Sequence, residues 1–250
     1  MSGDVLLDAR GLSRRFGAFR AVDGVDLAVR DGTIHSVIGP NGAGKTTLFR
    51  LLTGILRPTA GTLDFAGESI GGKPPDVIAR RGLAQAFQMT NIFPRLSVLD
   101  SVSAALVSRH RRATDMVTWF HRRVREEAYA VLDRVGLTDL AGAESQTLSH
   151  GDQRALEVAL ALAMGPRLLL LDEPTAGMSP FESERMVELV QGLARDSGLT
   201  VILSEHDMDT VFGISDEVTV MHQGRVIAEG RAADVRANEE VMAIYLGDQP

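Results

Sequence analysis

The sequence of 250 residues contains no cysteine. Disulfide bonds and thiolate metal sites are therefore excluded, which is compatible with a reducing cytosol. A membrane-spanning helix needs about 18 consecutive apolar residues. The best apolar run of the chain, residues 158–164, is far shorter. The first residues, MSGDVLLDAR, lack a basic segment that leads into an apolar one, so no signal peptide is expected.

Basic side chains are in the minority, and lysine is rare among them. The chain has 26 Lys and Arg against 33 Asp and Glu, a net charge of −7. Proteins that bind nucleic acid along a basic surface normally show the opposite balance, so no nucleic-acid partner is expected. Lys45 and Lys73 are the only lysines. A lysine kept in a chain that otherwise uses arginine indicates a position that needs a compact ammonium group.

The most specific motif is a glycine-rich loop between an expected strand and an expected helix. Residues 34–38 (IHSVI) have the pattern of a short buried strand, and a helical apolar pattern begins at Leu48. GPNGAGKTT stands between them and matches the P-loop, whose glycines let backbone N–H groups face phosphate oxygens. The predicted nucleotide-binding residues are Gly39, Pro40, Asn41, Gly42, Ala43, Gly44, Lys45, Thr46 and Thr47. Of these, Lys45 supplies positive charge and the Thr46 hydroxyl can ligate Mg²⁺.

Two carboxylates follow a second apolar run. Residues 168–171 are all leucine and Asp172 and Glu173 come directly after them, as in a parallel strand buried on both faces. Asp172 is predicted to hold Mg²⁺, and Glu173 to orient and deprotonate an attacking water. The alternative is a strand that simply ends in solvated acids.

Two weaker candidates stand after other strand-like segments. His206 follows the apolar residues 200–203 and could reach a γ-phosphate, although a lone histidine after a strand is usually a surface residue. Gln88 follows residues 83–87 and could contact the metal or its water. Ser149, in LSHGDQ, is a preferred N-cap for the helix expected over residues 154–164. LSHGDQ is therefore either a simple helix cap or part of a nucleotide site.

The P-loop, Gln88, LSHGDQ, LLLLDEP and His206 occur in a fixed order. This series resembles the ATPase subunits of ATP-binding cassette (ABC) proteins over essentially the whole chain. The resemblance implies a single α/β domain: a P-loop NTPase core with a mixed sheet flanked by helices, an N-terminal antiparallel β subdomain and an inserted α-helical subdomain. It divides the chain into a core, residues 1–91 and 160–250, and a helical signature segment, residues 92–159.

The resemblance also implies a head-to-tail dimer, in which each ATP lies between the P-loop of one subunit and LSHGDQ of the other. It assigns Ser149, His150, Gly151 and Asp152 to the partner's nucleotide, and Phe16 to the adenine ring, although a core phenylalanine is the alternative there. It further assigns Mg²⁺ to Thr46, Gln88 and Asp172, and catalysis to Glu173, His206 and Gln88. The implied cofactors are ATP and Mg²⁺.

Two positions depart from the family pattern. His150 stands where glycine is usual, and it could point away from the nucleotide or add a donor. Ser179 stands where many members have an aspartate that makes a contact between subunits.

Residues 87–102 (FQMTNIFPRLSVLDSV) and the short segments AGMSP, SEHDMDTVFG and YLG resemble the ATPases of branched-chain amino acid importers. Urea and amide importers share much of this pattern. The implied partners are integral membrane permease subunits, a second ATPase subunit, identical or sibling, and indirectly a periplasmic or extracellular solute-binding protein. The chain is expected in the cytoplasm, peripheral on the inner face of the cell membrane. A non-transport ABC ATPase and a P-loop kinase are the other classes considered.

Overall fold

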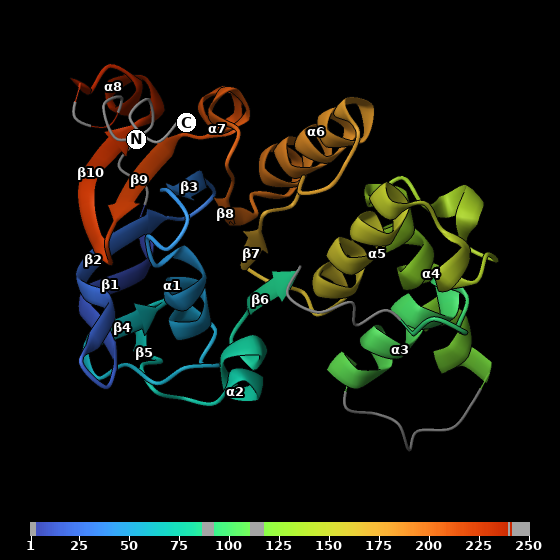
Figure 1. Ribbon diagram of the computed structural model, residues 1–250. Coiled ribbons are helices and arrows are strands. Elements are labelled where there is room, and N and C mark those ends of the chain that lie inside the picture. Colours follow the sequence, from blue (N-terminus) through green and yellow to red (C-terminus); the bar gives the residue numbers. More distant parts are fainter. Residues whose placement is uncertain (1–3, 87–92, 111–117, 240, 242–250) are drawn as a thin grey trace.

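The computed structural model describes residues 4–86, 93–110, 118–239 and 241, whose strands form two sheets (Figure 1). A four-stranded sheet has the order β2-β1-β4-β5, and a six-stranded sheet has the order β10-β9-β3-β8-β7-β6. The strands of the first sheet are β1 (Val5–Phe16), β2 (Phe19–Arg30), β4 (Ala60–Phe65) and β5 (Glu68–Ser69). Those of the second are β3 (Ile34–Ile38), β6 (Leu83–Ala86), β7 (Leu168–Asp172), β8 (Thr200–Ser204), β9 (Glu217–His222) and β10 (Arg225–Arg231).

The pairing confirms the predicted fold class. All pairs in the four-stranded sheet are antiparallel, which is the expected N-terminal β subdomain. In the six-stranded sheet β3, β6, β7, β8 and β9 run parallel, and β10 is antiparallel to β9, so this sheet is mixed. The parallel arrangement brings the carboxyl ends of β3, β7 and β8 to one edge, where ligands bind in open α/β sheets.

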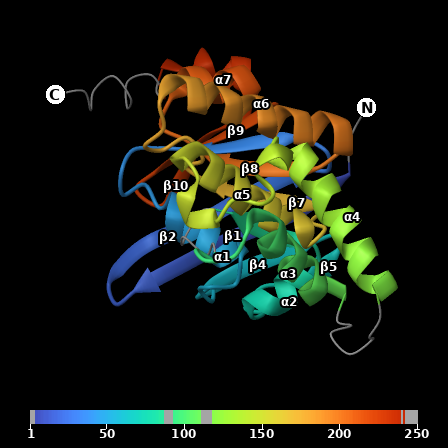
Figure 2. The same ribbon diagram turned by 90° about the vertical axis from the view of Figure 1, so that its right-hand side faces the viewer.

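Helices cover both faces of the six-stranded sheet. They are α1 (Lys45–Leu52), α2 (Pro75–Arg80), α3 (Val98–His110), α4 (Thr118–Arg134), α5 (His150–Ala163), α6 (Pro180–Ser197), α7 (Met208–Ile214) and α8 (Ala232–Arg236), with 3₁₀ turns at Thr138–Leu140 and Ser145–Thr147. In Figure 1, α1 lies between the two sheets, and α3, α4 and α5 lie together at the other side of the molecule. Figure 2 shows α5 and α6 in front of β7 and β8.

The strand β7 is buried on both faces, as its unbroken leucine run predicts. Leu169 and Leu171 pack in a core that includes α3, α4, α5 and α6. Leu168 and Leu170 pack in a second core with α1 and the four-stranded sheet. All four leucines are fully buried, and each such burial stabilises a fold by about 1.5–3 kcal/mol. The strand that carries Asp172 is therefore held from two sides.

The helical segment shares its hydrophobic core with the sheet. The core around α3, α4 and α5 also contains Leu169 and Leu203 of β7 and β8. The expected boundary between residues 91 and 92 lies outside the described residues, and the boundary between 159 and 160 falls within α5. The division of the chain at these positions remains a prediction. In the described part of the chain, no helix combines the length and the apolar character that crossing a membrane requires.

His35 is a buried histidine in the middle of the six-stranded sheet. Its side chain is fully buried, and its Nε2 hydrogen-bonds with Thr219 Oγ1 at 2.8 Å. Burial, and after it the charge of Arg30, lowers the pKa of His35 from 6.5 to about 4. Glu217 lies 3.8 Å from Nδ1, but it also pairs with Arg30 at 3.0 Å. We therefore expect burial to dominate and the folded protein to keep His35 neutral.

This depressed pKa predicts a loss of stability in mild acid. Between pH 6.5 and pH 4 the unfolded chain binds a proton at His35 and the folded chain does not, so the contribution of His35 falls with pH. The expected loss is about 3 kcal/mol in the free energy of unfolding. Urea unfolding at several pH values measures it, with His35→Gln as the non-titrating reference. Parallel pH profiles for the two proteins would contradict the prediction.

Candidate functional site

Two glycines of the P-loop stand where neighbouring strands leave no room for a side chain. Gly39 has φ 155°, and a Cβ atom there would lie 2.2 Å from the Met221 carbonyl oxygen of β9. Gly44 has φ 105°, and its Cβ would lie 2.4 Å from the Ala21 carbonyl oxygen of β2. Both contacts and both positive φ values require glycine. The loop is thus packed between strands of the two sheets.

The loop presents backbone donors at the start of α1. Within it, Ala43 N–H donates to the Pro40 carbonyl at 3.1 Å. In the described part of the chain, no protein acceptor pairs with the N–H groups of Gly44, Lys45 and Thr46. These groups stand at the positive end of a helix dipole, where anions bind. The predicted phosphate cradle is therefore open for a ligand.

The ammonium group of Lys45 lies inside the loop, where it donates to backbone carbonyls. Lys45 is buried, and its Nζ donates to the Gly39 carbonyl at 2.5 Å. Burial lowers the pKa of Lys45, while the charges of Glu173 and Asp172 raise it. The two acids at the end of β7 are therefore near enough to Lys45 for their charges to act on it. Thr46 follows on α1 and is exposed.

The two acids at the end of β7 are held by Ser204 of β8. The Ser204 hydroxyl donates to Asp172 Oδ1 at 2.6 Å and accepts from Glu173 N–H at 3.1 Å. Burial raises the pKa of Asp172, and the hydrogen bond from Ser204 opposes this shift. Glu173 has a left-handed backbone with φ 52°, a costly conformation for a residue other than glycine. Its N–H also donates to the Ser204 carbonyl at 3.1 Å.

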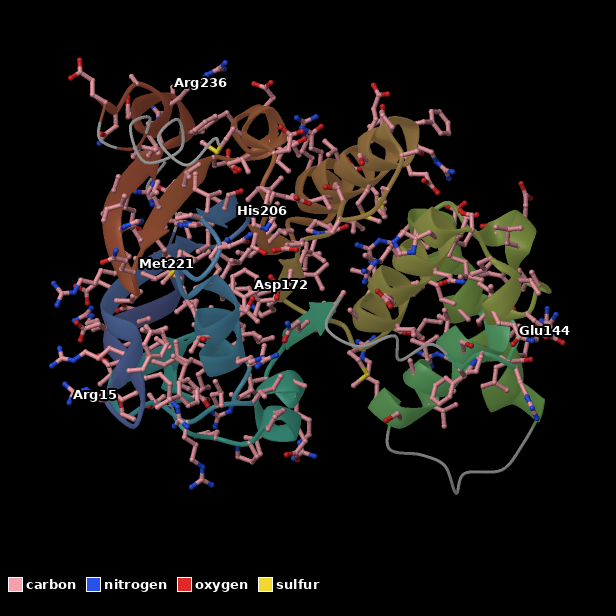
Figure 3. The ribbon with its side chains drawn as sticks, viewed as in Figure 1. Arg15, Glu144, Asp172, His206, Met221 and Arg236 are labelled. Carbon is pink, nitrogen blue, oxygen red and sulfur yellow. The ribbon has the colours of Figure 1, made fainter. Side chains whose placement is uncertain are left out.

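His206 and Glu173, both predicted as catalytic, lie together. The His206 Nε2–H donates to Glu173 Oε1 at 2.6 Å, and the two side chains are 46% and 38% exposed. In Figure 3 the labelled Asp172 and His206 lie close together at the centre of the molecule, far from Glu144 in the helical segment. The carboxyl ends of β7 and β8 therefore bring three predicted residues to one place.

LSHGDQ forms the start of α5, on the other face of the sheet from α1. Ser149 is the N-cap, and its Oγ accepts from Asp152 N–H at 3.1 Å and donates to Asp152 Oδ2 at 2.8 Å. Gly151 N–H donates to Glu182 Oε1 at 3.2 Å. The exposed His150 directs Nε2 to the Ala176 carbonyl at 3.5 Å. Because α1 and α5 pack in different cores, these residues and the P-loop of the same chain do not form one site.

Phe16 ends β1 and is 46% exposed, so the alternative of a core phenylalanine is wrong. The Arg14 guanidinium lies 4.7 Å from the centroid of its ring. Its role at the adenine ring remains a prediction. Gln88 lies outside the described residues. The sequence did not single out Ser204 or Glu205, and the one signal for them was their place directly before His206 at a strand end.

The comparisons with known proteins agree with this geometry. Residues 22–176 match the ABC transporter family model, and residues 225–249 match a model described as branched-chain amino acid ATP-binding cassette transporter. The chain is 40% identical to the high-affinity branched-chain amino acid transport ATP-binding protein BraF of Pseudomonas aeruginosa, over 97% of this chain and 98% of that protein. It is 38% identical to LivG of Escherichia coli, a protein described in the same words, with the same coverage.

Solved structures give the same assignment. A nucleotide-free ATP-binding cassette from an ABC transporter superposes with a TM-score of 0.85 and 28% identity, over 98% of this chain and 100% of that chain. A cassette of an ABC transporter in its ADP conformation matches with the same values. The matching family model covers more than half of the sequence, and the relatives align over nearly their whole length. The chain therefore belongs to the ABC transporter family of ATP-binding proteins.

Proposed function

We propose that the chain hydrolyses ATP as the energy-coupling subunit of an importer of branched-chain amino acids. The observation that carries the ATPase part is the convergence of the P-loop, Lys45, Asp172 and Glu173 at one sheet edge. The solute is supported by the match of residues 225–249 and by the names of BraF and LivG. The three-residue segment YLG, 245–247, lies within that matched C-terminal part.

The phosphates of ATP would lie on the N–H groups of the loop and on Lys45. Mg²⁺, when bound, would neutralise charge on the phosphate oxygens. Asp172 and Thr46 offer the hard oxygen ligands that this ion prefers, and Gln88 is the third proposed contact. The described residues contain no cluster of three acidic, histidine or cysteine side chains that could hold a metal alone. The donor set therefore suits an ion that also binds nucleotide phosphates and water.

Glu173 would accept a proton from a water as that water attacks the γ-phosphorus and ADP leaves. In the structure, Glu173 Oε1 accepts the His206 Nε2–H. Release of this contact would free the carboxylate for the water and the imidazole for the γ-phosphate. The Glu173 N–H donates to the hydroxyl and to the carbonyl of Ser204, and these hydrogen bonds would hold the backbone of the acid during this exchange.

The site would be completed by α5 of a second ATPase subunit, identical or sibling, in a head-to-tail dimer. The capped N-terminus of α5, with Ser149, His150, Gly151 and Asp152, would face the partner's γ-phosphate. Gly151 N–H is held by Glu182 in the single chain, so nucleotide would replace that contact. Residues 92–159 would form the helical subdomain that meets membrane permease subunits on the cytoplasmic face. A solute-binding protein outside the membrane would act through the permease.

Purification from native membranes tests the transport role. A tagged copy of the chain, expressed in its own organism, should recover multi-spanning permease subunits from detergent-solubilised membranes. The co-purifying proteins, identified by mass spectrometry, would also show whether a sibling ATPase completes the dimer. Recovery of only soluble or ribosomal proteins would contradict the importer and leave the ATP site in place.

Glu173→Gln tests the chemistry. The amide cannot take a proton from water, so turnover should fall by about a hundredfold or more while ATP still binds. Phosphate release measures turnover, and titration calorimetry measures the dissociation constant for ATP. Glu184→Gln, on an exposed part of α6, is the matched control and should keep normal turnover. Full activity of Glu173→Gln would remove this residue from its proposed role.

His150→Gly tests whether the histidine that stands where glycine is usual in the family takes part in the site. The imidazole is exposed and makes one long contact, to Ala176. ATPase activity of the variant should therefore stay within about threefold, which is under ~1 kcal/mol in barrier height. A loss of tenfold or more in phosphate release, with unchanged ATP binding, would mean that His150 contacts the reacting phosphate.

A further inference from the structure

We propose that Glu205 is a positioning residue for ATP hydrolysis, which fixes the segment after Glu173 relative to His206. Glu205 Oε1 accepts the Thr175 N–H at 2.8 Å and the Thr175 Oγ1–H at 2.7 Å. Its other oxygen, Oε2, accepts the His206 N–H at 3.3 Å. One carboxylate thus joins the turn after β7 to the turn after β8. The inference rests on the proposed function and deepens it.

The burial of Glu205 makes these contacts specific. The side chain is 4% exposed, and none of the ion pairs among the described residues includes it. The oxygens of a buried carboxylate have little access to water and need hydrogen-bond donors from the protein. Three donors from two turns meet that need, and two of them come from Thr175. A surface acid would accept from water equally well, but Glu205 is held to these partners.

Ser204 and Glu205, at the end of β8, bind different residues of the turn after β7. Ser204 binds Asp172 and the N–H of Glu173, which places the two acids. Glu205 accepts hydrogen bonds from Thr175, which lies two residues after Glu173, and so positions the start of residues 175–179. The turn after β7 is therefore attached at successive points to the turn that carries His206. Because Thr175 lies two residues after Glu173, we expect a shift of Thr175 to change the direction of the Glu173 carboxylate.

The segment that Glu205 holds leads to the proposed contact between subunits. Residues 175–179 run from Thr175 to Ser179, the N-cap of α6, and Ala176 in this segment meets His150 of α5. The same carboxylate accepts the backbone N–H of His206, the residue expected at the γ-phosphate. Glu205 therefore connects the segment after Glu173 with His206 and, through the contact of Ala176 with His150, with the start of α5.

Two substitutions of Glu205 test this inference in the complex purified with its membrane partners. Glu205→Gln keeps the volume but replaces an acceptor oxygen with an NH₂ group that faces N–H donors, and Glu205→Ala removes both oxygens. We expect kcat to fall by about tenfold or more in each, with the KM for ATP changed by less than about twofold. Thermal unfolding confirms that each variant is folded. A folded Glu205→Gln with kcat within twofold of the wild type would overturn the inference.

Asp31→Asn is the matched control for a purely structural effect. Asp31 Oδ1 accepts the Thr200 hydroxyl at 3.0 Å, at the opposite end of β8 from Glu205. This variant makes the same change from carboxylate to amide and also weakens the ion pair of Asp31 with Arg167, so its melting temperature should fall while kcat stays within about twofold. An equal loss of kcat in both variants would mean that Glu205 acts only through stability, against the proposal.

Coupling to Thr175 gives a second criterion. Thr175→Val removes the hydroxyl that donates to Glu205. Both substitutions disrupt this same hydrogen bond, so the double variant Thr175→Val with Glu205→Gln should be no slower than Glu205→Gln alone. Additive losses would contradict the link. If Glu173→Gln abolishes turnover but the Glu205 variants are normal, only the positioning role fails. If the wild-type complex does not hydrolyse ATP, the proposed function fails and the role of Glu205 with it.

Discussion

The packing of the glycine-rich loop between β2 and β9 is the constraint on which the rest of the site depends. Carbonyl oxygens of Ala21 and Met221 stand where side chains at positions 44 and 39 would be. The loop therefore lies directly against both sheets, and α1 begins at Lys45, immediately after the second of these glycines. The N–H groups at this helix start and the buried ammonium of Lys45, which donates to the Gly39 carbonyl, therefore belong to a loop that is packed on both sides. A phosphate site made of backbone atoms needs such support, because no side chain adjusts it.

The pairing of β7 with β8 fixes the second half of the site. Asp172 pairs with Ser204 at the ends of these parallel strands. A slip by one residue would exchange the leucines between the two hydrophobic cores and move Asp172 away from Ser204, so the packing of the leucines on both faces favours this register. The hydrogen bond from Ser204 to Asp172 follows from that register. Apolar side chains thus determine where the polar ones meet.

The parts of this structure that local patterns encode could be predicted from the sequence. The unbroken run before Asp172 has few alternatives to a doubly buried strand, and GPNGAGKTT has few alternatives to a phosphate loop. The contacts of Glu205 could not be predicted, because Thr175 lies 30 residues away and meets it only through the register of β7 and β8. The contact of the His150 side chain with Ala176 could not be predicted either, because it depends on where α6 places residues 175–179. Phe16 lacked a periodic signal that would separate a core ring from an exposed one.

The contacts of the single chain also indicate why such a site would work only when assembled. His206 donates to Glu173, and the Gly151 N–H donates to Glu182. These two donors, which are expected to bind a γ-phosphate, are therefore paired within the chain. Both contacts use a carboxylate as the acceptor. A phosphate oxygen is also an anionic acceptor and can replace a carboxylate at His206 and at the N–H of Gly151. Arrival of nucleotide and of a second subunit would exchange these internal partners without leaving a donor unpaired, and the acid released from His206 would be free to take a proton from water.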